Sequence, residues 1–242
     1  MSHVILERDA DLKIATLWLD YQQENRLSPA LIGDFLAALD EVEAAFDVRA
    51  LVVAGRHDKY FCTGLDLDHM MKNIGDMRAV VAYLEQMNTL FRRVTLFKKP
   101  TVAAINGHAF GGGLFLAAHM DFRLMREDRG WICLPEVDIN IPLLPGMLAV
   151  LEAVMPPHAV RRMYYSGKRY GGPEAVQLGF ADGAPSAEEL LPQARTLAAA
   201  LGKKRTATYA EFKRRLRGPV VRALDEDDPA AYESTLGFII KT

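Results

Sequence analysis

Two short, continuous apolar runs constrain the fold of this chain more than any other feature. Residues 50–54 (Ala-Leu-Val-Val-Ala) and 101–105 (Thr-Val-Ala-Ala-Ile) each precede a glycine-bearing turn, and a stretch with helical spacing separates them at 76–97. Apolar runs of this length are typical of strands that are buried on both faces. Buried strands that alternate with helices predict an α/β layered core rather than an all-β or all-α fold.

The flanking segments fit the same fold class. Residues 4–6 and 14–19 are apolar stretches separated by polar residues, and they predict an opening β-hairpin. Ser28 and Pro29 predict the N-cap and the first position of an amphipathic helix over 29–46. Two further short strands are expected, at 122–125 and 131–133.

Helices are expected to dominate the last part of the chain. Ser186 and Glu189 form a Ser-x-x-Glu capping-box signature before a helix. Basic residues then gather at 203–217, and acidic residues follow at 225–228. Charge runs of this kind are typical of solvated helix faces, and contact with phosphate groups is the weaker alternative.

Composition excludes several classes of partner. Lys and Arg total 29 against 31 Asp and Glu in 242 residues, a formal net charge of −2, so no basic excess points to nucleic acid. Cys62 and Cys133 show no CxxC pattern, and the histidines show no metal-ligand spacing such as HExxH. Charged residues interrupt the first ten positions, and no stretch reaches the roughly 18 apolar residues of a membrane span. We expect a soluble cytoplasmic protein with no disulfide, metal, membrane or nucleic-acid partner.

Two glycine-bearing turns after the buried strands carry the candidate chemistry. They are residues 61–67 (Phe-Cys-Thr-Gly-Leu-Asp-Leu) and 106–113 (Asn-Gly-His-Ala-Phe-Gly-Gly-Gly). Glycine lets the backbone approach a ligand closely, and the start of a helix, here expected at Gly112, leaves N–H groups unpaired. Two converging N–H donors make a preformed site for an oxyanion. Tight packing is the alternative explanation of the glycines, and their spacing is not the GxGxxG of dinucleotide-binding proteins.

These turns resemble two motifs of the crotonase superfamily, also called the enoyl-CoA hydratase/isomerase family. Residues 61–67 resemble F-x-x-G-x-D-[LI], residues 106–113 resemble N-G-x-x-x-G-G-G, and the likeness covers nearly the whole chain. The resemblance implies that the N–H groups of Leu65 and Gly112 form an oxyanion hole that polarises a thioester carbonyl. It also implies a coenzyme A thioester as substrate and assembly into homotrimers or hexamers.

The same resemblance implies an α/β fold with a crotonase-like core of repeated ββα units and a helical C-terminal region. We assign residues 1–185 to the core domain and 186–242 to the helical region, which packs on the core or on a neighbouring subunit. Besides the two donors, six residues of the turns and of the helix that follows are expected to bind substrate: Cys62, Gly64, Asp66, Gly111, Gly113 and Phe115.

One carboxylate remains where hydratases of the family carry two. Their first glutamate is replaced here by Phe115, whereas Glu136 falls on the segment that supplies the second, Leu-Pro-Glu-Val-Asp-Ile at 134–139. The longer run 108–142 looks most similar to Δ3,Δ2-enoyl-CoA isomerases of the plant and peroxisomal type.

A single carboxylate suits isomerisation. Moving a double bond from C3 to C2 requires removal of a proton from C2 and its return at C4, with a thioester enolate between, and one base on one face can do both. Hydration must activate water and also deliver a proton, and Phe115 can do neither. The apolar Phe115 is also expected to dry the pocket and raise the pKa of Glu136. We therefore predict an isomerase that converts 3-enoyl-CoA to trans-2-enoyl-CoA in fatty acid β-oxidation, with Glu136 as acid/base and no cofactor besides the coenzyme A of the substrate.

Two other functions stay open. A hydratase or another acyl-CoA lyase could recruit Asp138, which shares a face with Glu136 if that stretch is extended. A non-catalytic acyl-CoA-binding paralogue is the alternative from a different class.

Several polar residues near the motifs have ordinary explanations. Cys62 lacks a histidine partner and is expected to be a small packed side chain. Asp66 is expected to fix its loop, and His108 to be structural. The basic residues considered for the coenzyme A phosphates are Lys59, Lys98 and Lys99.

Overall fold

The largest sheet of the protein has five strands. The structure is a computed structural model, which describes residues 2–241. In sheet order its strands are β1 (Val4–Asp9), β2 (Ile14–Leu19), β3 (Ala50–Gly55), β5 (Thr101–Ile105) and β7 (Phe122–Met125). β1 and β2 form an antiparallel hairpin, and the other neighbours are parallel. The predicted hairpin and both buried strands are confirmed.

A second, smaller sheet lies next to the first and holds β4 (Tyr60–Cys62), β6 (His108–Phe110) and β8 (Ile132–Cys133), all parallel. Each of these strands comes shortly after a strand of the large sheet, and helices follow β4 and β6. The chain therefore repeats a ββα unit, as the crotonase-like α/β core requires.

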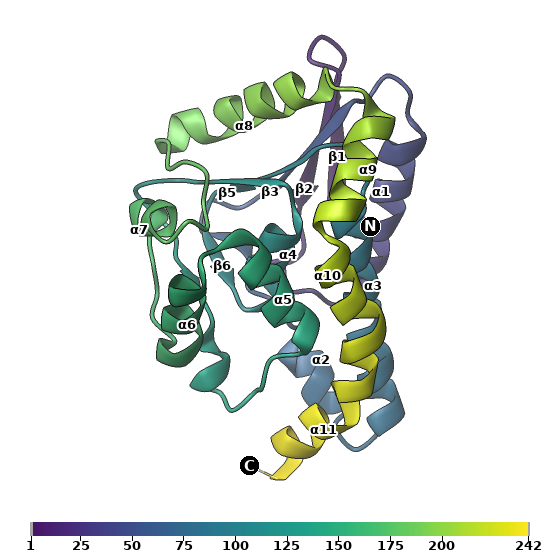
Figure 1. The fold of residues 1–242 in the computed structure, drawn as a ribbon, viewed down its shortest axis with the longest axis vertical. Coiled ribbons are helices and arrows are strands. Elements are labelled where there is room, and N and C mark those ends of the chain that lie inside the picture. Colours follow the sequence, from purple (N-terminus) through teal and green to yellow (C-terminus); the bar gives the residue numbers. More distant parts are fainter. Residues whose placement is uncertain (1, 242) are drawn as a thin grey trace.

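Helices cover both faces of the large sheet (Figure 1). On one face lie α1 (Pro29–Ala44), α3 (Met77–Thr95) and α4 (Gly112–His119), and on the other lies α8 (Ala187–Gly202). The short α2 (Leu67–Lys72) follows β4 and lies away from this sheet. Because side chains alternate along a strand, Leu51 and Val53 join the core under α1, α3 and α4, whereas Val52 and Ala54 join the core under α8. This alternation explains why the central strands are apolar throughout.

The predicted N-terminus of the first helix is confirmed. The Oγ atom of Ser28 accepts from the N–H of Leu31 at 3.2 Å, and Pro29 is the first helical residue. The helix ends at Ala44 rather than at residue 46. The side chain of Ser186 makes no capping hydrogen bond, so the predicted capping box does not form although α8 begins where expected.

The remaining helices follow β8 and make up most of the second half of the chain. They are α5 (Pro145–Val154), α6 (Pro157–Ser166), α7 (Gly172–Gln177), α9 (Thr206–Leu216), α10 (Gly218–Arg222), a π-helical turn (Ala223–Asp227) and α11 (Asp228–Lys241). In the described chain α10 and α11 pack against α5, and α11 also contacts α3. The division of the chain at residue 185 stays a prediction.

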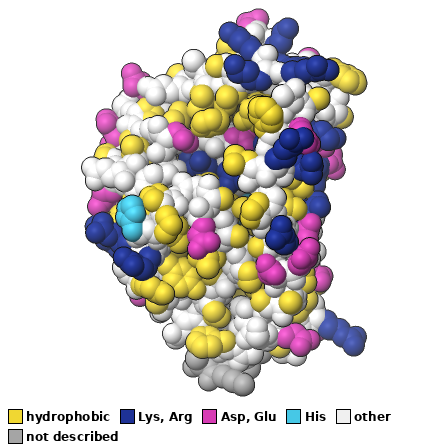
Figure 2. Space-filling model, viewed as in Figure 1, with side chains coloured by type: hydrophobic (Ala, Val, Ile, Leu, Met, Phe, Trp, Pro, Cys, Tyr) yellow, Lys and Arg dark blue, Asp and Glu magenta, His cyan; other side chains and the backbone are white. Residues whose placement is uncertain are grey.

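The basic run at 203–217 is not uniformly solvated, contrary to expectation. Lys and Arg side chains do gather where α8 meets α9 (Figure 2), but Lys213 and Arg217 are each only 6% exposed. The Nζ atom of Lys213 lies 3.0 Å from a carboxylate oxygen of Asp121 and donates to the Phe97 carbonyl at 2.8 Å. Buried charges need such partners, so this part of the run fastens α9 to the core.

No helix within residues 2–241 is both long enough and apolar enough to cross a membrane.

Candidate active site

The two glycine-bearing turns meet at the start of α4. A Cβ atom added to Gly64 would lie 2.6 Å from the backbone nitrogen of Gly112, and one added to Gly112 would lie 3.3 Å from the nitrogen of Leu65. Gly64 also has a φ of 90°, a conformation that side chains disfavour. A side chain at position 64 would therefore clash with the start of α4, and one at position 112 would crowd the first turn, so the two glycines allow the turns to pack closely.

Hydrogen bonds on the opposite side of each peptide unit set the direction of these N–H groups. The carbonyl of Gly64 accepts from the N–H of Leu27 at 2.8 Å, and the carbonyl of Gly111 accepts from the N–H of Phe115 at 3.0 Å. In a planar trans peptide the C=O and the N–H point in opposite directions. The N–H groups of Leu65 and Gly112 therefore point away from these partners, and within the described chain neither donates a hydrogen bond.

A tyrosine from α3 holds the first turn in place. The Oη atom of Tyr83 accepts from the N–H of Asp66 at 2.9 Å and donates to the Leu27 carbonyl at 2.6 Å. The Asp66 carboxylate accepts from the N–H of His69 at 3.1 Å and caps α2, as expected of a residue that fixes its loop. Tyr83 lies within the helical stretch predicted at 76–97, but no sequence pattern marks it as a partner of the turn.

The start of α4 is polarised. Its N-cap is Gly111, which has no side chain to satisfy the first N–H groups, and all eight helical residues are buried. The N-terminus of a helix carries a partial positive charge that favours anions. A negatively charged oxygen near Gly112 would thus meet both a free N–H and a favourable dipole.

Among the described residues, Glu136 has the only carboxyl group that lines the two cavities near the turns. It belongs to a 3₁₀ turn (Pro135–Val137), its side chain is buried, and its Oε2 atom has no hydrogen-bond partner among the described residues. A Cβ atom added to Gly111 would lie 2.5 Å from Oε1, which places the carboxyl beside the start of α4. Burial raises the pKa of Glu136 to about 7.

An inner cavity of about 30 Å³ joins these three groups. Leu65, Gly112 and Glu136 line it, and its remaining walls are apolar except for Thr235. A larger outer cavity of about 210 Å³ also reaches Glu136 but neither Leu65 nor Gly112. Glu136 thus lies between the two spaces, and only the inner one combines the carboxyl with both N–H donors.

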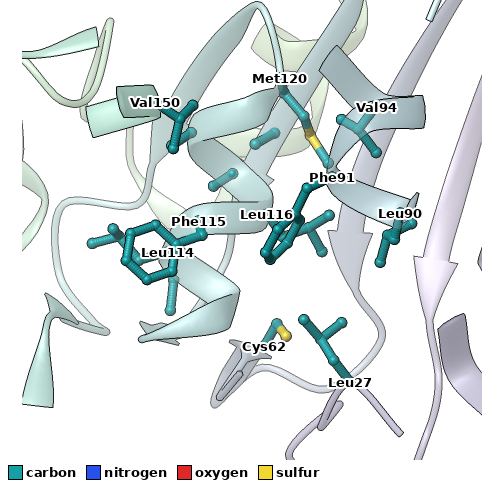
Figure 3. Close-up of a cluster of buried hydrophobic side chains, with 14 of the residues drawn as sticks. Leu27, Cys62, Leu90, Phe91, Val94, Leu114, Phe115, Leu116, Met120 and Val150 are labelled. Atoms are coloured by element: carbon teal, nitrogen blue, oxygen red, sulfur yellow. The ribbon is translucent and has the colours of Figure 1, made fainter. Parts of the chain in front are cut away.

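Two residues expected to bind substrate lie in the core instead. Phe115 is fully buried among apolar side chains and lines neither cavity, and Cys62 is likewise fully buried (Figure 3). The Sγ atom of Cys62 donates to the Asn25 carbonyl at 3.0 Å, and burial raises the pKa of this thiol to about 12. A Cβ atom on Gly113 would lie 2.0 Å from the Cys62 carbonyl oxygen, so Gly113 serves close packing of the two turns. The apolar walls that bury Glu136 come from other residues than Phe115.

Asp138 does not share a face with Glu136. The segment is a 3₁₀ turn rather than extended, because Pro135 occupies its first position, and the Asp138 side chain is exposed beside Gly167. The condition under which Asp138 was considered as a second acid is therefore not met.

One of the three basic candidates for phosphate contact has a structural role. Lys99 is buried, and its Nζ atom donates to the carbonyls of Val42 and Ala45 at 2.5 and 2.6 Å, at the end of α1. It is thus not free to contact coenzyme A, while Lys59 and Lys98 are exposed.

His108 packs within the second turn, in line with the structural role expected of it. Its ring accepts a hydrogen bond from the backbone N–H of Trp131 at 3.2 Å and stacks on the Trp131 indole. The described residues hold no cluster of three or more His, Cys, Asp or Glu side chains that could bind a metal.

Comparison with known proteins agrees with this fold. Residues 10–233 match the enoyl-CoA hydratase/isomerase family. The chain is 30% identical over 226 residues to an enoyl-CoA delta isomerase 3 of Arabidopsis thaliana, covering 91% of this chain and 94% of that protein. It is 34% identical over 184 residues to a peroxisomal enoyl-CoA delta isomerase 2 of the same plant, covering 74% and 75%. The human mitochondrial Δ3-Δ2-enoyl-CoA isomerase superposes with a TM-score of 0.91 at 23% identity over 99% of this chain and 92% of that one.

The fold and the paired backbone donors define a crotonase-fold protein. The chain belongs to the enoyl-CoA hydratase/isomerase family, because the family match covers nearly its whole length.

Proposed function

We propose that this protein is a Δ3,Δ2-enoyl-CoA isomerase that converts 3-enoyl-CoA to trans-2-enoyl-CoA in fatty acid β-oxidation. The observation that carries the proposal is the lone carboxyl of Glu136, which is buried, has one unpartnered oxygen and lines the same cavity as the N–H groups of Leu65 and Gly112. The similarity to two plant enoyl-CoA delta isomerases supports it.

In the proposed reaction, the thioester oxygen accepts hydrogen bonds from Leu65 and Gly112, and Glu136 removes a proton from C2. The electron pair moves onto the thioester and forms an enolate, whose negative oxygen the two N–H groups and the start of α4 stabilise. The same carboxyl then returns the proton to C4 while the C2–C3 double bond forms. Substrate and product have the same atoms and the proton passes only through Glu136, so each step balances, and we propose no cofactor besides the coenzyme A of the substrate.

The raised pKa of Glu136 suits this cycle. A group that both takes and returns a proton works best when its pKa is near the working pH. Burial moves the pKa of Glu136 to about 7. At neutral pH a substantial share of the molecules then carries the ionised base, and the protonated form still gives its proton back readily.

Hydration is the competing reaction within the same family. It requires a second group that handles a proton or water, and among the described residues the cavities offer no other carboxyl. The discriminating experiment supplies 3-enoyl-CoA and 2-enoyl-CoA separately and follows 2-enoyl-CoA and 3-hydroxyacyl-CoA as products. We expect 2-enoyl-CoA from the first substrate and no hydroxyacyl product from the second. Rapid hydration of 2-enoyl-CoA would instead make the protein a hydratase, and no reaction with either would favour a non-catalytic acyl-CoA-binding protein.

Assembly and location belong to the same proposal. We infer a homotrimer or hexamer in the cytoplasm, and sedimentation of the purified protein tests the assembly.

A further inference from the structure

The inner cavity ends against α11. Its apolar walls include Met70 and Leu84 on one side, Met147 from α5, and Leu236 from α11. Leu236 is only 1% exposed and belongs to the main hydrophobic core. An acyl group whose carbonyl lies at Leu65 and Gly112 has its remaining carbons within this apolar space.

The space is small. The inner cavity provides about 30 Å³, about a seventh of the volume of the outer cavity. It can hold the first few carbons of an acyl chain beyond the carbonyl, but not a long tail. Longer chains must displace a wall.

The wall formed by α11 is firmly attached. The first residue of α11 is Asp228, whose carboxylate accepts two hydrogen bonds. The N–H of Gly146, at the start of α5, donates one at 2.6 Å, and the side-chain amide of Asn88 on α3 donates the other at 3.1 Å. The Nδ2 atom of Asn88 also donates to the Leu224 carbonyl at 2.8 Å. α11 is thereby tied to both helices that supply the other walls, Met147 from α5 and Leu84 from α3.

The outer cavity is a different route for a long chain. It shares Glu136 with the inner cavity but is walled by Tyr164 and Phe238, close to the hydrophobic side chains that gather between α6 and α11 in Figure 2. The oxyanion donors do not line it. The two cavities also share Ile141, Pro142 and Leu143. A tail that leaves the inner cavity for the outer one would cross this shared lining, beside the carboxyl that the reaction requires at C2 and C4.

We propose that Leu236 on α11 forms the end of the acyl pocket and restricts this protein to short acyl-CoA thioesters, with chains of about four to six carbons. This inference rests on the proposed function for the position of the thioester. It names the substrate class, which the family alone does not define.

The test compares kcat/KM for 3-enoyl-CoA thioesters of four, six, eight and ten carbons in the wild type, Leu236→Ala and Leu216→Ala. Leu216 is 78% exposed on α9, away from both cavities, so Leu216→Ala is the matched control. One extra methylene in a tight apolar pocket changes kcat/KM by about 10–200-fold. We expect the wild type and the control to lose at least tenfold between six and ten carbons, and Leu236→Ala to recover most of that loss.

Leu236→Phe provides a second variant that adds volume. It should lower kcat/KM for six carbons more than for four, and this relative change is readable even if Leu236→Ala folds poorly. Wild-type kcat/KM that does not change with chain length would overturn the proposal. So would a chain-length dependence that changes in Tyr164→Ala but not in the Leu236 variants, which would indicate that the tail binds in the outer cavity.

Binding separates this inference from the proposed reaction. Dissociation constants of saturated butanoyl-, hexanoyl- and decanoyl-CoA depend on the pocket and not on isomerisation. Weaker decanoyl-CoA binding that Leu236→Ala restores, in a protein without isomerase activity, would uphold the pocket and refute the reaction.

Discussion

Two buried carboxyl groups stand on elements that wall the same cavity, and their surroundings differ. Glu136 is 8% exposed and one of its oxygens has no partner, whereas Asp228 is 2% exposed and both of its oxygens accept hydrogen bonds. Burial raises both pKa values, to about 7 for Glu136 and about 6 for Asp228. A raised pKa alone therefore does not distinguish a chemical role from a structural one. The free oxygen and the cavity at Glu136 do, because a carboxyl that is already bonded on both sides cannot take a proton from a ligand.

Removal of each charge gives the largest expected contrast. Glu136→Gln should lower kcat for isomerisation by about 10²–10⁴-fold, because the amide cannot act as a base. Asp228→Asn should keep kcat within about tenfold, since its carboxylate acts only on the placement of α11. Steady-state rates with a four-carbon 3-enoyl-CoA measure both, and circular dichroism checks that both variants fold. Equal losses in the two variants would break the comparison.

Two glycines allow the same carboxyls to be displaced rather than removed. A Cβ atom added to Gly111 would lie 2.5 Å from Oε1 of Glu136, and one added to Gly146 would lie 2.7 Å from Oδ2 of Asp228. A misplacement of about 1 Å in a reacting group can cost about 10²-fold in rate, so Gly111→Ala should lose activity by about that factor. It should also lose some stability, because Gly111 has a φ of 47° that side chains disfavour. Gly146→Ala should lower stability by about 1–3 kcal/mol, as overpacking does, without the 10²-fold loss of rate. Rates and urea melts on both variants show whether the two losses separate in this way.

The pH dependence of the rate should report Glu136. As a base it must be ionised, so log kcat/KM should rise with pH and level off above pH 7, near the raised pKa of Glu136 of about 7. The rate then falls by about tenfold for each pH unit below that value. Asp228→Asn should leave this acid limb in place. If the rate instead fell only near pH 4.3, the ordinary pKa of glutamate, the pKa of Glu136 would not be raised for proton transfer.

The smallest expected effect is a gain in stability. Because the folded pKa of Glu136 is raised from 4.5 to about 7, the folded protein holds this proton more tightly than the unfolded chain. The free energy of unfolding therefore falls as pH rises from 4.5 to 7 and is unaffected by this group below that window. Glu136→Gln removes this fall in the free energy of unfolding, because the amide does not ionise. It should therefore stabilise the protein by on the order of 1–3 kcal/mol at pH 8 and leave its stability unchanged at pH 4. Asp228→Asn should show no such gain, because it loses hydrogen bonds. Chemical denaturation at the two pH values tests the contrast.

The sequence predicted those parts of the fold that depend on local patterns. The buried strands at 50–54 and 101–105, the cap at Ser28 and the helix start at Gly112 follow from periodicity and from glycine and proline chemistry. Long-range partners left no such pattern. Tyr83 binds the turn at Asp66 across 17 residues, and Asp228 caps α5 across 82.

Predictions that depended on where a side chain is buried were wrong for several residues. Lys213 and Arg217 were expected on a solvated helix face because a charge run shows no burial, and Lys99 was a candidate for phosphate contact. Each is instead buried and donates to backbone carbonyls. Phe115 follows the glycine motif in sequence, but its side chain leaves α4 on the core side. For Asp138 a signal did exist, since Pro135 favours the first position of a helical turn over an extended strand.

The most direct measurement follows the proton at C2. The protein is incubated with butanoyl-CoA in deuterated water, and nuclear magnetic resonance monitors the C2 protons in the wild type and in Glu136→Gln. Deuterium should enter C2 in the wild type and not in the variant, while both bind the thioester with similar affinity. Exchange at an undiminished rate in Glu136→Gln, or its absence in the wild type, would contradict the role assigned to this carboxyl.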